Sequence, residues 1–158
     1  MEYWNTYKTK IGMLIIAENE NRISRIVTIK ASEKYNNGEK IETPLIKEAY
    51  KQISEYLEGK RKEFTLPLLI KGTKFQEKVW NALLQIPYGE TRTYGEIAKQ
   101  IENEKASRAV GGANHNNKVM IVVPCHRVIG SNKKLVGYAG GLDIKETLLK
   151  LEQQNKDI

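Results

Sequence analysis

The sequence predicts an α+β protein with a small, strand-rich N-terminal α/β domain and a mostly helical C-terminal domain. Three observations lead to this prediction. Short β-branched runs dominate the first thirty residues, apolar residues at helical spacing follow over 43–59, and two helix-start signatures appear soon after residue 72. A chain of 158 residues can bury a stable core without disulfides. We place the domain boundary after residue 70, giving domains at 1–70 and 71–158.

The first thirty residues contain two apolar runs separated by a polar turn. Residues 11–17 form the first run, and residues 22–30 form the second, which is rich in isoleucine and valine. The polar stretch between them favours a hairpin or a meander of strands.

A helix is predicted to follow these strands. Thr43 suits the cap and Pro44 the first helical position, while Gly59 is a suitable stop. Residues 63–70 are expected to form an edge strand or an extended linker, because Pro67 cannot donate a hydrogen bond to a ladder.

The C-terminal part opens with two capping boxes. In residues 73–76 and again in residues 93–96, a threonine is followed three positions later by Gln or Glu, an arrangement typical of helix starts. A short polar turn separates the second of these helices from segment 106–113. Two short helices joined by a tight turn outline a helix-turn-helix, although the same outline occurs in many helical proteins that bind no DNA.

Segment 106–113 carries little side-chain bulk apart from Arg108. Small residues there either pack closely against another element or leave room for a ligand backbone or a narrow groove. Gly111 and Gly112 each weaken a helix by roughly 1 kcal/mol, so some geometric gain is expected at these positions.

The remaining elements are an extended segment and a final helix. Residues 119–123 are apolar and mostly β-branched, which predicts a short buried strand or extended segment. The last helix is predicted to start with Asp143 as its cap and to end near Gln154.

Composition limits the compartment and the partners. The formal charge is +7, with 13 Lys and Arg against 10 Asp and Glu in residues 1–72, and 13 against 9 in residues 73–158, so no basic arm stands out. A basic chain is compatible with nucleic acid, yet many basic proteins bind none. No apolar run reaches membrane-spanning length and the N-terminus does not resemble a signal peptide, so a cytoplasmic protein without a membrane segment is expected. The abundance of Lys, Glu and Ile leans towards a thermophilic source.

Cys125 is the single cysteine, and His115 and His126 are the only histidines. A disulfide within the chain and a multi-cysteine zinc site are therefore impossible, and we expect no bound metal. Cys125 is either a small buried apolar residue or a reactive thiol. His126 can activate it only if the chain turns at Pro124 and Cys125 or if a water bridges the pair, because adjacent side chains of a strand point to opposite faces.

The segment Pro124-Cys125-His126-Arg127-Val128 resembles the active-site signature of the O6-alkylguanine-DNA alkyltransferases. The similarity continues, in the family's order and spacing, through Arg108-Ala109-Val110-Gly111-Gly112-Ala113, Asn117, Tyr138-Ala139-Gly140-Gly141-Leu142 and Lys145-Glu146-Thr147-Leu148-Leu149. Matching residues are frequent over residues 73–152. Before residue 73 the similarity is limited to the order of elements, a strand-rich region followed by a helix.

The resemblance implies a DNA repair protein acting on double-stranded DNA. Such a protein transfers the alkyl group, usually methyl, from the O6 atom of guanine irreversibly to its own Cys125. It acts once, without a cofactor, as a monomer, and takes the damaged base out of the helix. O4-alkylthymine is a second substrate that the sequence leaves open.

The resemblance also assigns roles to particular residues. Cys125 would accept the alkyl group, His126 would act as a base through a bound water, and Glu152 would orient His126. Tyr94 would donate a proton or hydrogen bond to the flipped guanine, and Arg108 would enter the stack that the base leaves. The other contacts implied are Asn117 as a hinge, Ala109, Gly111 and Gly112 on a helix in the minor groove, and Val128, Tyr138, Ala139 and Gly140 around the alkyl pocket.

These residues also have plainer interpretations, and the sequence departs from the family at two positions. Glu152 and Arg108 can be exposed helix charges, and Tyr94 a hydrophobic cap on a helix start. Ala139 replaces a Ser of some relatives, which removes a side-chain donor near the guanine oxygen. Met120 replaces a Pro, which bears on the acceptance of bulky alkyl groups. The ligands of the zinc site found in certain relatives are absent.

Two other functions stay open at this point. A non-catalytic protein that binds and flags the lesion is the first, but alkyltransferase-like proteins of this kind lack the cysteine, so Cys125 argues against it. A transcription regulator using the helix-turn-helix is the second. It would need neither the Cys125 signature nor Glu152, and no dimerisation segment is apparent.

Overall fold

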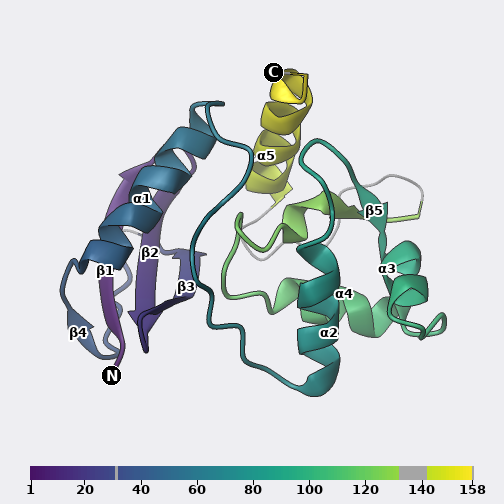
Figure 1. The fold of residues 1–158 in the computed structure, drawn as a ribbon, viewed down its shortest axis with the longest axis horizontal. Helices are drawn as coiled ribbons and strands as arrows, with labels where there is room; N and C mark the ends of the chain where they lie inside the picture. Colours follow the sequence, from purple (N-terminus) through teal and green to yellow (C-terminus); the bar gives the residue numbers. More distant parts are fainter. Residues whose placement is uncertain (31, 132–141, 158) are drawn as a thin grey trace. The chain divides into compact units, whose positions relative to one another are not determined.

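A computed structural model describes residues 1–30, 32–131 and 142–157 of the chain. The chain divides into two compact units, Met1–Ile70 and Lys71–Ile158. The first unit is rich in strands and the second is mostly helical (Figure 1), which confirms the predicted α+β class. Within the described residues, every helix is too short or too polar to cross a membrane.

A four-stranded sheet with the order β3-β2-β1-β4 forms the first unit. Its strands are β1 (Tyr3–Thr9), β2 (Gly12–Asn19), β3 (Arg22–Thr28) and the two-residue β4 (Glu39–Lys40). The first three make an antiparallel meander, as the apolar runs predict, and β4 pairs in parallel with β1. Glu20 and Asn21 connect β2 to β3 with φ values of 56° and 59°, the left-handed conformation that matches the strand twist in a two-residue hairpin.

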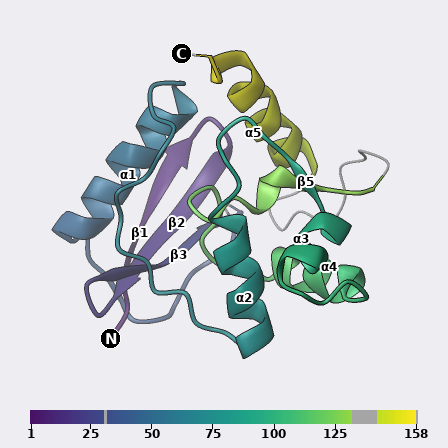
Figure 2. The same cartoon turned by 45° about the vertical axis from the view of Figure 1, so that its right-hand side comes forward.

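Helix α1 (Pro44–Leu57) lies along one face of this sheet (Figure 2). Its cap is the predicted one, because Thr43 Oγ1 accepts a hydrogen bond from the Ile46 amide at 3.2 Å. Burial of an apolar stripe on α1 against the meander stabilises this unit. Fully buried residues of this core include Leu14, Ile16, Ile26, Ile46, Ala49 and Ile53.

Residues 67–69, within the predicted 63–70 segment, pair with the open edge of β3. The Ile23 amide donates to the Pro67 carbonyl at 2.8 Å, and the Leu69 amide donates to the Ile23 carbonyl at 2.8 Å. Pro67 therefore only accepts, which is the role that the sequence predicts for it.

Three helices begin the second unit: α2 (Lys74–Leu83), α3 (Tyr94–Gln100) and α4 (Ser107–His115). Both predicted capping boxes are formed at Thr73 and Thr93. Strands β5 (Arg92–Thr93) and β6 (Val128–Ile129) pair in parallel, and β6 follows the 3₁₀ turn η1 (Cys125–Arg127).

Two expectations about this unit are wrong in detail. Residues 119–123 are buried but form turns instead of a strand, with Ile121 at a φ of 74° and the Val123 amide bonded to the Val119 carbonyl at 3.0 Å. Helix α5 spans Leu142–Asn155, so Asp143 lies in its first turn and is not its cap. Sequence patterns place such ends only within one or two residues.

Candidate active site

Cys125 begins the turn η1, directly after Pro124, and its side chain is only 1% exposed. The turn is closed by the Arg127 amide, which donates to the Pro124 carbonyl at 2.9 Å. The alternation of an extended strand therefore does not apply here. The chain turns at Pro124 and Cys125, which is one of the two conditions under which Cys125 and His126 can act together.

The side chain of Asn117 makes hydrogen bonds that hold this turn in place. Its amide nitrogen Nδ2 lies 3.1 Å from Cys125 Sγ and donates to the Val123 carbonyl at 2.9 Å, while Oδ1 accepts from the Val119 amide at 3.0 Å. These bonds satisfy the Val119 amide and the Val123 carbonyl, which helps an apolar, β-branched run to fold mainly as turns. Asn117 follows α4 and precedes the cysteine, the place expected of a hinge.

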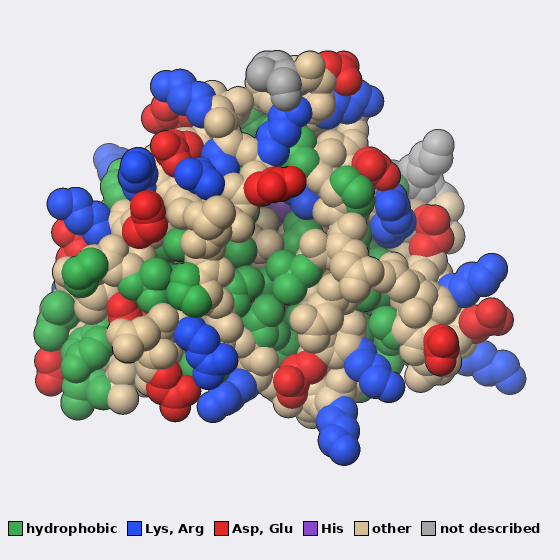
Figure 3. All heavy atoms as spheres, in the orientation of Figure 1, with side chains coloured by type: hydrophobic (Ala, Val, Ile, Leu, Met, Phe, Trp, Pro, Cys, Tyr) green, Lys and Arg blue, Asp and Glu red, His purple; other side chains and the backbone are tan. Residues whose placement is uncertain are grey.

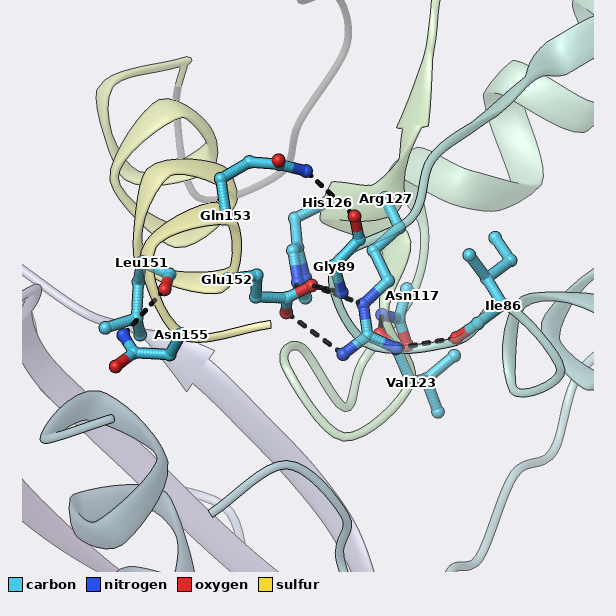
Figure 4. A network of polar contacts seen from close by, with 10 residues as sticks. All are labelled: Ile86, Gly89, Asn117, Val123, His126, Arg127, Leu151, Glu152, Gln153 and Asn155. Atoms are coloured by element: carbon cyan, nitrogen blue, oxygen red, sulfur yellow. Dashed lines mark hydrogen bonds and ion pairs between the residues drawn. The ribbon is translucent and has the colours of Figure 1, made fainter. Parts of the chain in front are cut away.

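The carboxylate of Glu152, on α5, is buried in a cluster of donors (Figure 4). Arg127 donates from Nε at 2.8 Å and from Nη2 at 3.0 Å, the Gly89 amide donates at 3.0 Å, and His126 Nε2 lies 2.6 Å away. The interpretation of Glu152 as an exposed helix charge is therefore wrong. Burial alone would raise the pKa of Glu152, but the hydrogen bonds and charges of His126 and Arg127 outweigh it and hold the pKa well below its usual range.

His126 is fully buried beside this carboxylate. Burial lowers the pKa of His126 below 6.5, the Glu152 carboxylate opposes the shift, and the charges of Arg127 and Lys145 add to it. His126 is therefore neutral near pH 7. An ionised carboxylate only accepts hydrogen bonds, so Nε2 carries the proton and Nδ1 is the basic nitrogen.

Two further bonds tie the same cluster together. Arg127 Nη1 donates to the Ile86 carbonyl at 2.7 Å, and Gln153 Nε2 donates to the Gly89 carbonyl at 2.8 Å. Gly89 has a φ of 80°, and a Cβ atom there would lie 2.8 Å from Lys156 Cβ. Helix α5 and the segment before β5 are thus fixed to each other at Glu152.

Lys145 is a site residue that sequence reasoning missed. Its side chain is wholly buried, Nζ donates to the Val128 carbonyl at 2.5 Å, and Nζ lies 5.9 Å from the ring centre of Tyr94. Burial lowers the pKa of Lys145 to about 8, and the charge of Cys125 opposes this shift. The available signal was helical spacing, because Lys145 shares the inward stripe of α5 with Leu148 and Glu152.

We expect the substitution Lys145→Met to stabilise the protein at pH 7. The folded-state pKa of about 8 lies below the ordinary value of 10.5, so the folded protein holds a charged lysine at a cost below pH 8. Methionine removes this cost, but it also removes the donor that the Val128 carbonyl accepts from. On balance the substitution should raise the free energy of unfolding by about 2 kcal/mol. The gain should shrink as the pH rises from 8 to 10.5. Urea unfolding at pH 7 and pH 9.5 measures both values, and a less stable variant at pH 7 would contradict the argument.

Tyr94, the first residue of α3, is half-buried near the thiol. Burial raises its pKa, the charge of Cys125 raises it further, and a hydrogen bond from Asn114 lowers it. Tyr94 is therefore a neutral phenol at pH 7 that can donate a hydrogen bond or a proton.

The predicted DNA-binding residues lie mainly on the surface of α4. Arg108, Ala109 and Gly112 are exposed, whereas Gly111 is partly covered. A Cβ atom on Gly111 would lie 3.9 Å from the Tyr94 ring, and one on Gly112 would meet no atom within 4 Å. Packing among the described residues therefore does not require glycine at position 112.

The other predicted residues divide into two groups. Val128 is buried beside the thiol segment, and Met120 is buried in the turn that follows Asn117. Tyr138, Ala139 and Gly140 lie outside the described residues. In the part of the chain that the structure describes, no three His, Cys, Asp or Glu side chains gather in a way that could hold a metal ion.

Comparisons with known proteins cover almost all of the chain. Residues 2–70 match the family model "6-O-methylguanine DNA methyltransferase, ribonuclease-like domain", and residues 74–154 match the model of the DNA binding domain of the same family. The methylated-DNA–protein-cysteine methyltransferase of Methanosarcina acetivorans is 50% identical over 158 residues, covering 95% of this chain and 97% of the relative. The constitutive enzyme of Bacillus subtilis is 50% identical over 159 residues, covering 97% and 96%.

A solved structure agrees with these sequence matches. The crystal structure of Mycobacterium tuberculosis OGT in complex with DNA superposes with a TM-score of 0.89 at 41% identity, covering 97% of this chain and 94% of that one. Both units thus match models of one family, and nearly the whole chain aligns with relatives and a solved structure of that family, so the chain belongs to the 6-O-methylguanine DNA methyltransferase family.

Proposed function

We propose that this protein repairs DNA by moving the alkyl group of O6-alkylguanine irreversibly to its own Cys125, once per molecule, after the base has been flipped out of the duplex. The observation that carries the proposal is the buried Cys125 thiol within a turn held by Asn117 and flanked by the His126–Glu152–Arg127 cluster. Family membership supports the reaction class. Residues 71–158 would hold both the DNA-binding surface and the alkyl acceptor, in the cytoplasm and as a monomer.

The geometry supports a single displacement step. Nδ1 of neutral His126 takes the thiol proton through a water, and the thiolate attacks the alkyl carbon. A carbon–sulfur bond forms as the carbon–O6 bond breaks, and its electron pair passes into the guanine ring. Tyr94 supports the departing guanine by donating a hydrogen bond or proton, and the Lys145 charge stabilises the thiolate beforehand.

Irreversibility follows from the chemistry of the product. The thioether has no proton to lose, and a thiolate is a poor leaving group from an unactivated alkyl carbon. Turnover would require a separate thiol to reach a sulfur that is 1% exposed. One protein molecule is therefore expected to repair one lesion.

The surface of α4 supports the DNA-binding part of the proposal. Ala109 and Gly112 present almost no bulk, and Arg108 projects from the same exposed surface. A bulk-free helix with a single long cation fits a narrow groove in which one side chain replaces a flipped base. On the face drawn in Figure 3, Lys and Arg are interspersed with Asp and Glu, so the charge of that face is diffuse.

We expect the substitution Gly112→Leu to separate folding from DNA binding. Leucine is a better helix former than glycine, and its Cβ atom would meet no atom of the described residues within 4 Å, so the variant should be more stable by up to about 1 kcal/mol. Its bulk should block the groove and weaken binding to duplex DNA by about 10-fold or more. Fluorescence anisotropy with labelled duplex and thermal unfolding measure the two effects.

The free base O6-benzylguanine is the matched control, because it needs no groove and no flipping. Gly112→Leu should react with it at the wild-type rate, and Arg108→Ala should slow repair of duplex more than reaction with this base. Unchanged duplex affinity of Gly112→Leu would rule out α4 as the DNA-binding surface.

Intact-protein mass spectrometry tests the proposed function directly. Incubation with a duplex containing O6-methylguanine should add one methyl group per protein molecule, and peptide mapping should place it on Cys125. Tight lesion binding without a mass change would favour the non-catalytic lesion-binding function instead. Binding to one undamaged sequence in preference to the lesion would favour a transcription regulator.

A further inference from the structure

Asn114, in the last turn of α4, reaches the site from the DNA-binding helix. Its side chain is buried, with an exposed fraction of 1%. The amide nitrogen Nδ2 donates to the Cys125 carbonyl at 3.2 Å, and a hydrogen bond from the same side chain acts on the Tyr94 phenol. The nitrogen end of this amide is therefore committed to the Cys125 carbonyl.

The oxygen end of the Asn114 amide is a hydrogen-bond acceptor without a donor among the described residues. Asn114 Oδ1 is buried and has no hydrogen-bond partner among the residues that the structure describes. The amide cannot be turned to exchange its ends, because a carbonyl oxygen facing the Cys125 carbonyl would place two acceptors together. Buried polar atoms are nearly always satisfied in native proteins, so an orphan acceptor beside a reactive thiol indicates a donor that arrives with the ligand.

We propose that Asn114 Oδ1 accepts a hydrogen bond from the 2-amino group of the alkylated guanine and so makes the site selective for guanine lesions. This inference rests on the proposed function and deepens it, since it names the group of the substrate that is read. Oδ1 and Nδ2 belong to one small planar amide, so the acceptor lies within a few ångströms of the Cys125 carbonyl. The 2-amino group lies on the same Watson–Crick edge of guanine as O6, so a base whose alkyl carbon reaches the thiol brings this group towards the amide.

The chemistry of the lesion singles out one donor. Alkylation at O6 removes the proton from N1 of guanine, and N3 and N7 are acceptors. The 2-amino group is then the sole N–H donor on the base. O4-alkylthymine has lost its N3 proton and has no N–H donor at all. An obligate acceptor in the pocket therefore favours O6-alkylguanine over O4-alkylthymine, and also over any purine without the 2-amino group.

The experiment compares two lesions that differ only in this group. Duplexes carrying O6-methylguanine or O6-methylhypoxanthine are placed opposite an abasic site, so that the 2-amino group makes no base pair. Methyl transfer to Cys125 is followed by mass spectrometry under single-turnover conditions. The wild-type protein should prefer O6-methylguanine by about 10-fold, because the analogue leaves the acceptor unpaired. Asn114→Leu and Asn114→Ala should lower this preference to about twofold or less.

Asn116→Leu is the matched control, since it removes an exposed amide from the C-terminal end of the same helix and should keep the wild-type preference. The ratio of the two lesions cancels any general loss of DNA affinity or of rate. O4-methylthymine provides a second comparison. The ratio of the methyl-transfer rate on O6-methylguanine to that on O4-methylthymine should also be smaller in the Asn114 variants than in the wild-type protein.

Equal wild-type rates on the two purine lesions would overturn the inference without any variant. An undiminished preference in Asn114→Leu or Asn114→Ala would overturn it as well. Failure of the proposed function looks different, because then neither lesion would place a methyl group on Cys125.

Discussion

Cys125→Ser is expected to abolish methyl transfer while the protein stays folded and still binds DNA. Serine keeps the size of the side chain, and its hydroxyl can accept the bond that Asn117 Nδ2 directs at the sulfur. A hydroxyl is far harder to ionise than a thiol, so His126 cannot produce the attacking anion near pH 7. We expect the rate to fall by at least about 1000-fold, with lesion affinity changed by no more than about twofold.

Two measurements separate these effects. Chromatography of the digested oligonucleotide reports whether O6-methylguanine persists, and anisotropy reports binding. A serine variant that removes the lesion at the wild-type rate would show that Cys125 is not the acceptor. Loss of binding together with loss of transfer would instead point to a structural role, which far-ultraviolet circular dichroism would reveal.

Glu152→Gln is expected to weaken both the fold and the reaction. The substitution keeps the shape of the side chain but leaves the buried Arg127 guanidinium without its anionic partner. Removing one partner of a buried ion pair typically costs about 3–5 kcal/mol, although the glutamine oxygen still accepts one hydrogen bond here, so we expect a loss of about 3 kcal/mol. Loss of the carboxylate also removes the group that orients His126 and favours proton transfer to it.

The pH dependence of stability has a definite sign for this residue. The folded-state pKa of Glu152 lies below its ordinary value of 4.5, so its contribution is fully present above pH 4.5 and is lost as the pH falls below that value. The stability difference between the wild-type protein and Glu152→Gln should therefore be constant from pH 6 to pH 8 and shrink in acid. Urea unfolding at several pH values measures it, and a gap that widens in acid would contradict the assignment.

The transfer rate of Glu152→Gln should fall near pH 7 and recover largely at high pH, where the thiolate forms without a base. His126→Ala should behave in the same way, and the two losses should not add, because both residues act on one proton relay. Wild-type rates near pH 7 in both variants would refute the relay and leave Cys125 activated by another group, such as Arg127.

Features that depend on residues close together in the chain could be read from the sequence. The capping boxes at Thr73 and Thr93, the cap at Thr43 and the meander of strands each depend on side chains within a few positions of one another. Local hydrogen bonds and apolar periodicity determine such elements almost independently of the rest of the fold. The signature around Cys125 is equally local, which is why the family resemblance could be found from the sequence.

Tertiary structure alone decided the features that depend on distant residues. Residues 119–123 have the composition of a strand, yet the Asn117 side chain bonds to the backbone of Val119 and Val123 and the segment folds mainly as turns. Lys145 has the appearance of a surface charge, but α5 buries it against the Val128 carbonyl. Glu152 meets Gly89 across 63 residues of sequence and Arg127 across 25. A buried charge is tolerable only where the fold brings partners to it, and no local pattern states which partners those are.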